Sequence, residues 1–267
     1  MLYQRKSNPW IFSPQKRTLA PHLRLFCLPY AGGGASIYHP WSSDLAPAIE
    51  VCAIQLPGRE NRFSELPYTN LTQLIETLAP ILMPYLDIPF AFFGHSMGAL
   101  ISFELARYFQ REAGIEPVYL FVSGHRAPHL ARTHRPLHAL PTADFIQELR
   151  QLNGTPEAVL QNDSLFELLL PVLRADFELC ETYTYGAQNT LSCPILAIGG
   201  LQDSDISCDA IEGWREHTEG QFGRRFFPGD HFFLNQHRYY ITRLIMHKVS
   251  QNTVCSQSCN QLRERVS

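Results

Sequence analysis

The sequence GHSMG at residues 94–98 can place a serine nucleophile in a tight turn. It follows an apolar run at residues 90–93 and precedes residues 99–106, whose apolar side chains recur at helical spacing. A G-x-S-x-G pattern between a strand and a helix is typical of a nucleophile elbow, in which larger side chains at the glycine positions would clash. We therefore predict that Ser96 is a nucleophile exposed at the edge of a sheet.

A serine hydroxyl becomes an effective nucleophile beside a base that is itself oriented by an acid. In proteins with a nucleophile elbow these partners follow in the chain order serine, acid, histidine. Asp203 and Asp205 both come shortly after the apolar run 195–198, at the carboxyl end of a predicted strand. We favour Asp203 as the acid, because it comes first after the turn, and keep Asp205 as the alternative.

The base is predicted from the histidines that follow these aspartates, which are four of the 11 in the chain. His217 lies in a predicted helix, and His237 and His247 belong to an amphipathic pattern near the C-terminus. His231 instead lies in a loop directly after the strand-like residues 224–227. The base must extend from such a loop over the edge of the sheet towards the serine, so we predict that His231 is the base.

Two backbone N–H groups are needed to stabilise the oxyanion that forms during attack on a carbonyl. Met97, the residue after the nucleophile, supplies one at the start of its helix. The loop PYAGGG at residues 29–34 follows a predicted strand, and its glycines let the backbone approach a ligand closely. We predict Ala31 as the second donor. The loop lacks the G-K-[ST] and G-x-G-x-x-G patterns of phosphate-binding loops.

The elements that must position these residues alternate along the chain. Apolar runs bounded by proline, glycine or polar residues are typical of parallel strands that are buried on both faces. Helical spacing of apolar residues occupies 71–83 and 97–112, between such runs. This alternation predicts an α/β fold, a mostly parallel sheet flanked by helices. The predicted strands are residues 23–28, 51–56, 90–93, 118–122 and 195–198.

Residues from about 126 to 186 interrupt the alternation, because they contain helical patterns and no strand-like run. We predict helices at 144–152, 156–161 and 164–181. An all-helical insertion between two strands is typical of a lid over the carboxyl edge of a sheet, and an ordinary helical layer is the alternative. Within the insertion, the apolar residues 165–170 are predicted to pack in a core rather than to line an acyl pocket.

Composition sets limits on the class of protein. The chain has 267 residues, of which 45% are hydrophobic and 18% charged, and this balance excludes a disordered chain. The net charge of −3 gives no basic field for nucleic acid. Apolar stretches are shorter than the roughly 20 residues that span a bilayer. We expect one soluble domain at 22–249, a flexible arm at 1–21 and a flexible tail at 250–267.

The seven cysteines are scattered, and their odd number favours free thiols in a reducing compartment. The N-terminus lacks the apolar segment of a secretory signal, so we expect a cytoplasmic protein. A basic, histidine-rich segment at the start of the insertion is interpreted as a solvated loop rather than a site for a metal, a phosphate or an acidic partner. We predict no metal site and no cofactor site. The residues of the segment are His125, Arg126, His129, Arg132, His134, Arg135 and His138.

Several motifs in a fixed order resemble the type II thioesterases, stand-alone enzymes of nonribosomal peptide and polyketide synthetases. The resemblance extends from residue 23 to residue 249. It is carried by PYAGG at 29–33, LPGRE at 56–60, FFGHSMG at 92–98, LRAD at 173–176 and PGDHFF at 228–233.

The resemblance implies an α/β-hydrolase fold with a helical lid, and hydrolysis of acyl thioesters on the phosphopantetheine arm of carrier proteins. The implied role is editing, the removal of stalled or wrongly loaded acyl groups. It assigns Ser96 as nucleophile, Asp203 as acid, His231 as base, and Ala31 and Met97 as oxyanion donors, with carrier protein domains as partners. It implies a monomer and no metal or diffusible cofactor. In one departure, Asp230 stands where the family more often has glycine, beside the predicted base, and in another the N-terminal arm is longer.

Two other functions remain open from the sequence. A carboxylesterase or lipase acting on oxygen esters would use the same three residues. A catalytically inactive α/β-hydrolase could bind acyl carrier proteins without cleaving a substrate. Substrate preference separates the first from a thioesterase, and labelling by a serine-directed fluorophosphonate probe separates the second.

Overall fold

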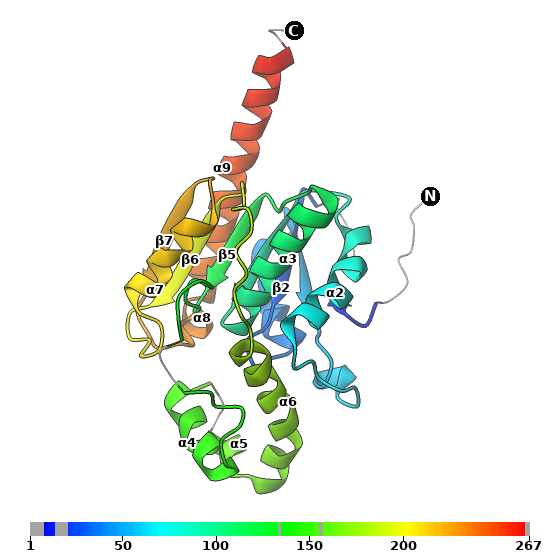
Figure 1. Cartoon of the computed structure of the whole chain (residues 1–267). Helices are drawn as coiled ribbons and strands as arrows, with labels where there is room; N and C mark the ends of the chain where they lie inside the picture. The colour runs from blue at the N-terminus through cyan, green and yellow to red at the C-terminus, as the bar shows by residue number, and fades with distance from the viewer. Residues whose placement is uncertain (1–7, 14–20, 133–134, 155–156, 265–267) are drawn as a thin grey trace.

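A computed structural model of the chain describes residues 8–13, 21–132, 135–154 and 157–264. Its centre is a seven-stranded sheet with the order β1-β3-β2-β4-β5-β6-β7 (Figure 1). All neighbouring strands are parallel except the first pair. The strands are β1 (Ile11–Phe12), β2 (Leu23–Leu28), β3 (Ile49–Ile54), β4 (Phe90–His95), β5 (Tyr119–Ser123), β6 (Ile195–Gly200) and β7 (Phe222–Phe227). The predicted parallel sheet is confirmed, with strand ends shifted by up to two residues.

The central strands are buried on both faces, which explains why they are continuous apolar runs. Side chains alternate between the two faces of a strand. Phe26 and Phe92, which are paired in register, therefore enter one core, and Leu25 and Phe93 enter the other. The strands thus divide the core into two layers.

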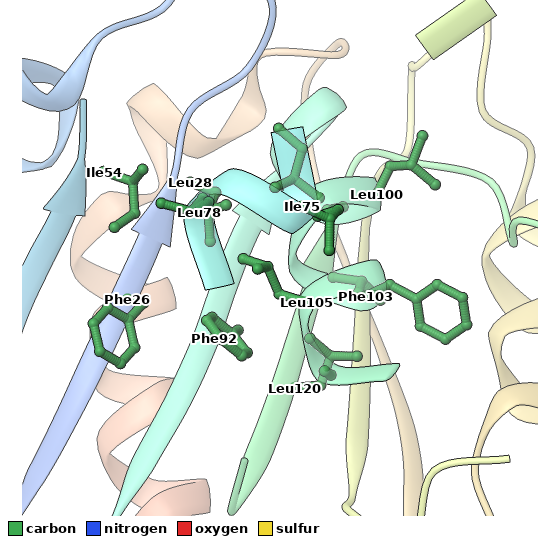
Figure 2. Close-up of a cluster of buried hydrophobic side chains, with 14 of the residues drawn as sticks. Phe26, Leu28, Ile54, Ile75, Leu78, Phe92, Leu100, Phe103, Leu105 and Leu120 are labelled. Atoms are coloured by element: carbon green, nitrogen blue, oxygen red, sulfur yellow. The ribbon is translucent and has the colours of Figure 1, made fainter. Parts of the chain in front are cut away.

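Helices α2 (Leu71–Leu82) and α3 (Met97–Ala113) cover the first layer, as Figure 2 shows for the residues around Phe103. Helices α1 (His39–Leu45) and α9 (Arg238–Glu264) cover the second. The shorter helices are α7 (Cys208–Glu212), α8 (Phe233–Gln236) and four 3-10 turns, η1 (Ala35–Tyr38), η2 (Glu60–Arg62), η3 (Met83–Tyr85) and η4 (Gly213–His217). No helix in the described ranges combines the length and apolar character needed to cross a membrane.

The predicted insertion contains helices and no strand among its described residues, although residues 126–132 and 135–141 at its start form turns and irregular backbone. It comprises α4 (Thr142–Leu152), α5 (Glu157–Leu160) and α6 (Asp163–Glu181), which lie together at one end of the molecule (Figure 1). These helices share a small core of their own, formed by Phe145, Leu149, Leu160, Phe166 and Leu173. We call α4, α5 and α6 the lid.

The prediction that residues 165–170 pack in a core is correct only in part. Phe166 is buried in the lid core, and Leu169 and Leu170 pack against it. Leu165 and Leu168 are instead 39% and 55% exposed. Successive residues of a helix point in different directions around its axis, so the apolar side chains of residues 165–170 on α6 cannot all face the lid core.

The structure differs from the prediction at both ends of the chain. Strand β1, within the expected flexible arm, pairs antiparallel with β3, with Ile11 opposite Ile54. Residues 1–7 and 14–20 of that arm lie outside the described residues. Helix α9 continues to Glu264 through most of the expected tail and projects from the end opposite the lid (Figure 1). Neither proline nor glycine occurs between Arg238 and Glu264 to end the helix.

Candidate active site

The predicted nucleophile occupies a strained turn between β4 and α3. Ser96 has a φ of +54°, which is uncommon for a residue with a side chain. Its N–H donates to the carbonyl of Ser123 at 2.8 Å, and its own carbonyl accepts from the N–H of Ala99 at 2.9 Å. These bonds fix the turn on both sides, so that the hydroxyl projects from the end of β4.

The glycines of the elbow are required because backbone segments approach one another closely. A Cβ at Gly94 would clash with the carbonyl of Gly98. A Cβ at Gly98 would clash with the carbonyl of Leu28, at the end of β2. The second contact brings the start of α3 against the loop that follows β2, which carries Ala31. The two predicted oxyanion donors are therefore held near each other by the sequence of the elbow.

The structure brings the predicted serine, histidine and acid into one hydrogen-bonded line. The Ser96 Oγ lies 3.0 Å from Nε2 of His231, and Nδ1 of His231 lies 2.7 Å from Oδ2 of Asp203. The Asp203 side chain is 1% exposed, and its Oδ1 accepts the backbone N–H groups of Asp205 and Ile206 at 3.0 and 3.2 Å. Asp203 is thus the carboxylate on the imidazole, and Asp205 helps to orient it through its backbone.

A cavity of about 340 Å³ opens between this line and the lid. Ala31 and Met97, the predicted oxyanion donors, both line it with Ser96 and His231. Met97 is the first residue of α3, where backbone N–H groups lack a partner within the helix. Side chains of the lid helix α6, including Leu173 and Phe177, form the opposite wall. A substrate carbonyl could therefore reach the serine while the lid excludes water.

His95, the residue before the nucleophile, is a buried imidazole within the elbow. His95 is fully buried, and its Nδ1 lies 2.9 Å from the hydroxyl of Ser123. Burial lowers the pKa of His95 well below its usual range, and the nearby ring of His231 adds to this effect. Burial likewise lowers the pKa of His125 to about 3. Both side chains therefore stay uncharged in the folded protein.

These buried imidazoles predict a loss of stability in acid. Below a pH of about 6.5 the unfolded chain binds protons at His95 and His125 that the native state excludes, so stability falls with pH. We expect each to lower the free energy of unfolding by about 2 kcal/mol between pH 7 and pH 5. Urea unfolding at both pH values measures the change. The His125→Gln variant should lose less stability over this range, and an equal loss would contradict the prediction.

The histidine-rich segment is only partly the solvated loop that the sequence predicts, since the Arg135 side chain is 62% exposed whereas other members are buried or half-buried. His125 is buried, and Arg126, Arg132 and Arg135 line the cavity. His138 lies 2.6 Å from a buried carboxylate at the end of α6. The segment begins shortly after β5, at the carboxyl edge of the sheet. His134 lies outside the described residues, among which no group of three or more metal-ligating side chains is found.

Asp230, the predicted departure beside the base, connects the histidine loop to the lid. Its Oδ1 accepts the N–H of Phe232 at 2.9 Å, and its Oδ2 accepts from the side-chain amide of Asn153 at 2.8 Å. Asn153 ends α4 with a φ of +57°. A Cβ at the next residue, Gly154, would clash with the ring of Phe232. The carboxylate therefore takes part in a contact between lid and loop.

Removing this carboxylate should loosen the lid more than the rest of the molecule. We expect Asp230→Ala to lower the free energy of unfolding by about 1 kcal/mol, because hydrogen bonds to a charged group are lost at a partly exposed site. Amide hydrogen exchange near Asn153 should accelerate. Asn153→Gly keeps the backbone conformation and removes the amide, so it should have a similar local effect. Unchanged exchange in both variants would refute the contact's role.

Two buried residues near the site were not assigned a role by sequence reasoning. Arg59 and Asp176 are 4% and 1% exposed and form an ion pair. Their only sequence signal was that each lies in one of the motifs that carry the resemblance. Their separation of 117 residues gives no local pattern that would connect them.

Comparisons with known proteins show the family of the chain. The thioesterase domain family matches residues 23–249. The chain is 50% identical over 239 residues to the gramicidin S biosynthesis protein GrsT of Aneurinibacillus migulanus, covering 90% of this chain and 93% of that protein. It is 41% identical over 214 residues to the thioesterase PikA5 of Streptomyces venezuelae, covering 80% and 76%.

A solved structure of the same kind also matches. The type II thioesterase BorB from the borrelidin biosynthetic cluster superimposes with a TM-score of 0.83 at 40% identity, covering 91% of this chain and 98% of that chain. The overall fold, a mostly parallel sheet with flanking helices, is thus shared with an α/β-hydrolase thioesterase. The chain therefore belongs to the thioesterase family, among relatives that are type II thioesterases of nonribosomal peptide and polyketide pathways.

Proposed function

We propose that this protein hydrolyses acyl thioesters carried on the phosphopantetheine arm of carrier proteins and so edits a nonribosomal peptide or polyketide synthetase. The observation that supports it best is the hydrogen-bonded line of Ser96, His231 and Asp203 facing a lid-covered cavity. In a thioesterase family with matched relatives named for gramicidin S biosynthesis and as the thioesterase PikA5, this site fits a carrier-bound substrate.

The proposed reaction begins with attack by Ser96. His231 Nε2 takes the hydroxyl proton while Oγ bonds to the thioester carbonyl carbon, and the resulting oxyanion accepts the N–H groups of Ala31 and Met97. The carbon–sulfur bond then breaks, and Nε2 returns the proton to the leaving thiolate. Asp203 keeps the imidazole in the tautomer that can accept at Nε2.

Hydrolysis of the acyl-enzyme repeats these steps with water. Nε2 of His231 takes a proton from the water that attacks the ester carbonyl, and then gives it to Oγ of Ser96 as the acid leaves. The residues of the chain supply the nucleophile, the base and the oxyanion donors, so the proposed reaction requires no cofactor or metal.

One experiment tests the substrate class. The same short acyl group is presented as a thioester on a holo carrier protein and as a p-nitrophenyl ester, and kcat/KM is measured for both. We expect a strong preference for the carrier-bound thioester. Equal or better cleavage of the oxygen ester would favour a general esterase. A folded protein that is not labelled by a fluorophosphonate probe would favour a non-catalytic carrier-binding protein.

A further inference from the structure

A buried ion pair joins the lid to the loop that follows β3. Nη1 and Nη2 of Arg59 donate to Oδ2 and Oδ1 of Asp176 at 2.7 and 2.8 Å. Paired bonds of this kind fix the orientation of both groups as well as their distance. Asp176 lies on α6, so the pair determines where this lid helix sits against the body of the protein.

The same pair holds the backbone directly after Ala31. The N–H of Gly32 donates to Oδ2 of Asp176 at 2.7 Å. Arg59 Nη1 also donates to the carbonyl of Gly33 at 3.3 Å. One carboxylate oxygen thus connects α6, the guanidinium and the loop that carries the predicted oxyanion donor.

Side chains from the loop after β3 bind the next N–H groups. Gln55 Oε1 accepts from the N–H of Ala35 at 2.6 Å. Glu60 Oε1 accepts from the N–H of Ser36 at 3.3 Å. The loop after β2 is therefore fixed from two sides, by Asp176 on the lid and by the loop after β3.

The N–H of Ala31 is left for a ligand. The carbonyl of Tyr30 accepts the N–H of Gly33 at 2.9 Å. Because the C=O and N–H of a trans peptide point in opposite directions, this bond directs the N–H of Ala31 away from Gly33. Within the described residues no protein acceptor is found for the Ala31 N–H, and Ala31 lines the cavity beside Ser96.

We propose that Asp176 and Arg59 are positioning residues that hold Gly32 so that the Ala31 N–H faces the oxyanion. They do so only while α6 packs against the loop after β2. The carboxylate acts through the backbone of Gly32. Lifting the lid helix would remove the acceptor of the Gly32 N–H, so lid closure would complete the oxyanion site. This inference rests on the proposed function, in which Ser96 attacks a thioester.

A purely stabilising role is the alternative, and a double variant separates the two. Replacing a buried ion pair by apolar residues of similar volume is often neutral for stability, whereas removing one partner leaves a buried charge unpaired. We therefore choose Arg59→Met with Asp176→Leu. Its melting temperature should stay near that of the wild type. Its kcat should fall by about 10- to 100-fold, with little change in KM. This decrease is no larger than the decrease in kcat expected when one oxyanion donor is removed.

A matched control uses another buried arginine in an ion pair. Arg107, on α3, is 3% exposed and pairs with Glu104 at 2.6 Å. The double variant Arg107→Met with Glu104→Leu removes this pair, whose described partners do not include the loop after β2. The pair also bonds Tyr183 and Gly186, in the segment that follows α6. The kcat of this variant should nevertheless stay within about twofold of the wild type, because neither side chain lines the cavity.

A second measurement reports directly on the oxyanion site. A boronic acid that forms a tetrahedral adduct with Ser96 should bind the Arg59→Met/Asp176→Leu variant more weakly, in parallel with kcat. A thioether analogue of the substrate, which forms no oxyanion, should bind this variant with the same affinity as it binds the wild type. Wild-type kcat and boronate affinity in the folded variant would overturn the inference. A wild-type protein that neither cleaves thioesters nor binds the boronate would instead overturn the proposed function.

The single variant Arg59→Lys decides the question if the double variant does not fold. Lysine keeps the positive charge beside Asp176 but loses the paired geometry. We expect a several-fold lower kcat and boronate affinity with unchanged binding of the thioether. Unchanged kcat in a folded Arg59→Lys protein would count against the positioning role.

Discussion

Ser96→Ala is expected to lower kcat for a carrier-bound thioester by about 10⁴- to 10⁶-fold, because no other group can form the acyl-enzyme. The side chain lies 3.0 Å from its base and faces the cavity, so its removal changes no core packing. The melting temperature should therefore stay within a few degrees of the wild type. Steady-state hydrolysis and thermal unfolding measure the two effects.

The matched control is Ser102→Ala on the same segment of chain. Ser102 lies on α3, and its buried hydroxyl has no hydrogen-bond partner in the part of the chain that the structure describes. Loss of such a hydroxyl is neutral or stabilising, so this variant should retain activity. Substantial hydrolysis by Ser96→Ala would remove Ser96 from the mechanism.

Asp203→Asn should lower kcat by about 10⁴-fold while the fold is retained. An amide at this position can donate to Nδ1 of His231, which favours the tautomer with a proton on Nε2. That nitrogen then cannot accept the proton of Ser96. The kcat of the purified variant on the carrier-bound thioester measures the loss.

Asp205→Asn is the control, because Asp205 was the alternative acid in the sequence. It contributes its backbone N–H to the Asp203 carboxylate, and the substitution leaves that bond in place. We expect less than about a tenfold loss of kcat, since the imidazole keeps its carboxylate. A larger loss in Asp205→Asn than in Asp203→Asn would reverse the assignment of the acid.

The sequence by itself determined the elements whose signals are local. The runs that form β2, β4, β5 and β6 are continuous and apolar because these strands are buried on both faces. The GHSMG turn is equally local, because its strain and its close contacts arise within a few residues. The chain order of serine, acid and histidine then placed the candidates at one edge of a parallel sheet.

Tertiary structure alone decided the features that depend on distant partners. Strand β1 is two residues long and owes its existence to pairing with β3. The sequence favoured Asp203 and left Asp205 open, and the alternative was closed only by the contact of the Asp203 carboxylate with a loop 28 residues further along.

The same limit applies to the contacts between the lid and the site. The bonds of Asp230 to Asn153 and of Asp176 to Arg59 join residues 77 and 117 positions apart. The residues next to a charged residue in the sequence do not indicate which distant residue it will pair with. An apolar periodicity or a tight-turn motif, by contrast, indicates the local structure directly. Local sequence therefore determined the nucleophile and the sheet that presents it, and the packing of the lid decided what surrounds them.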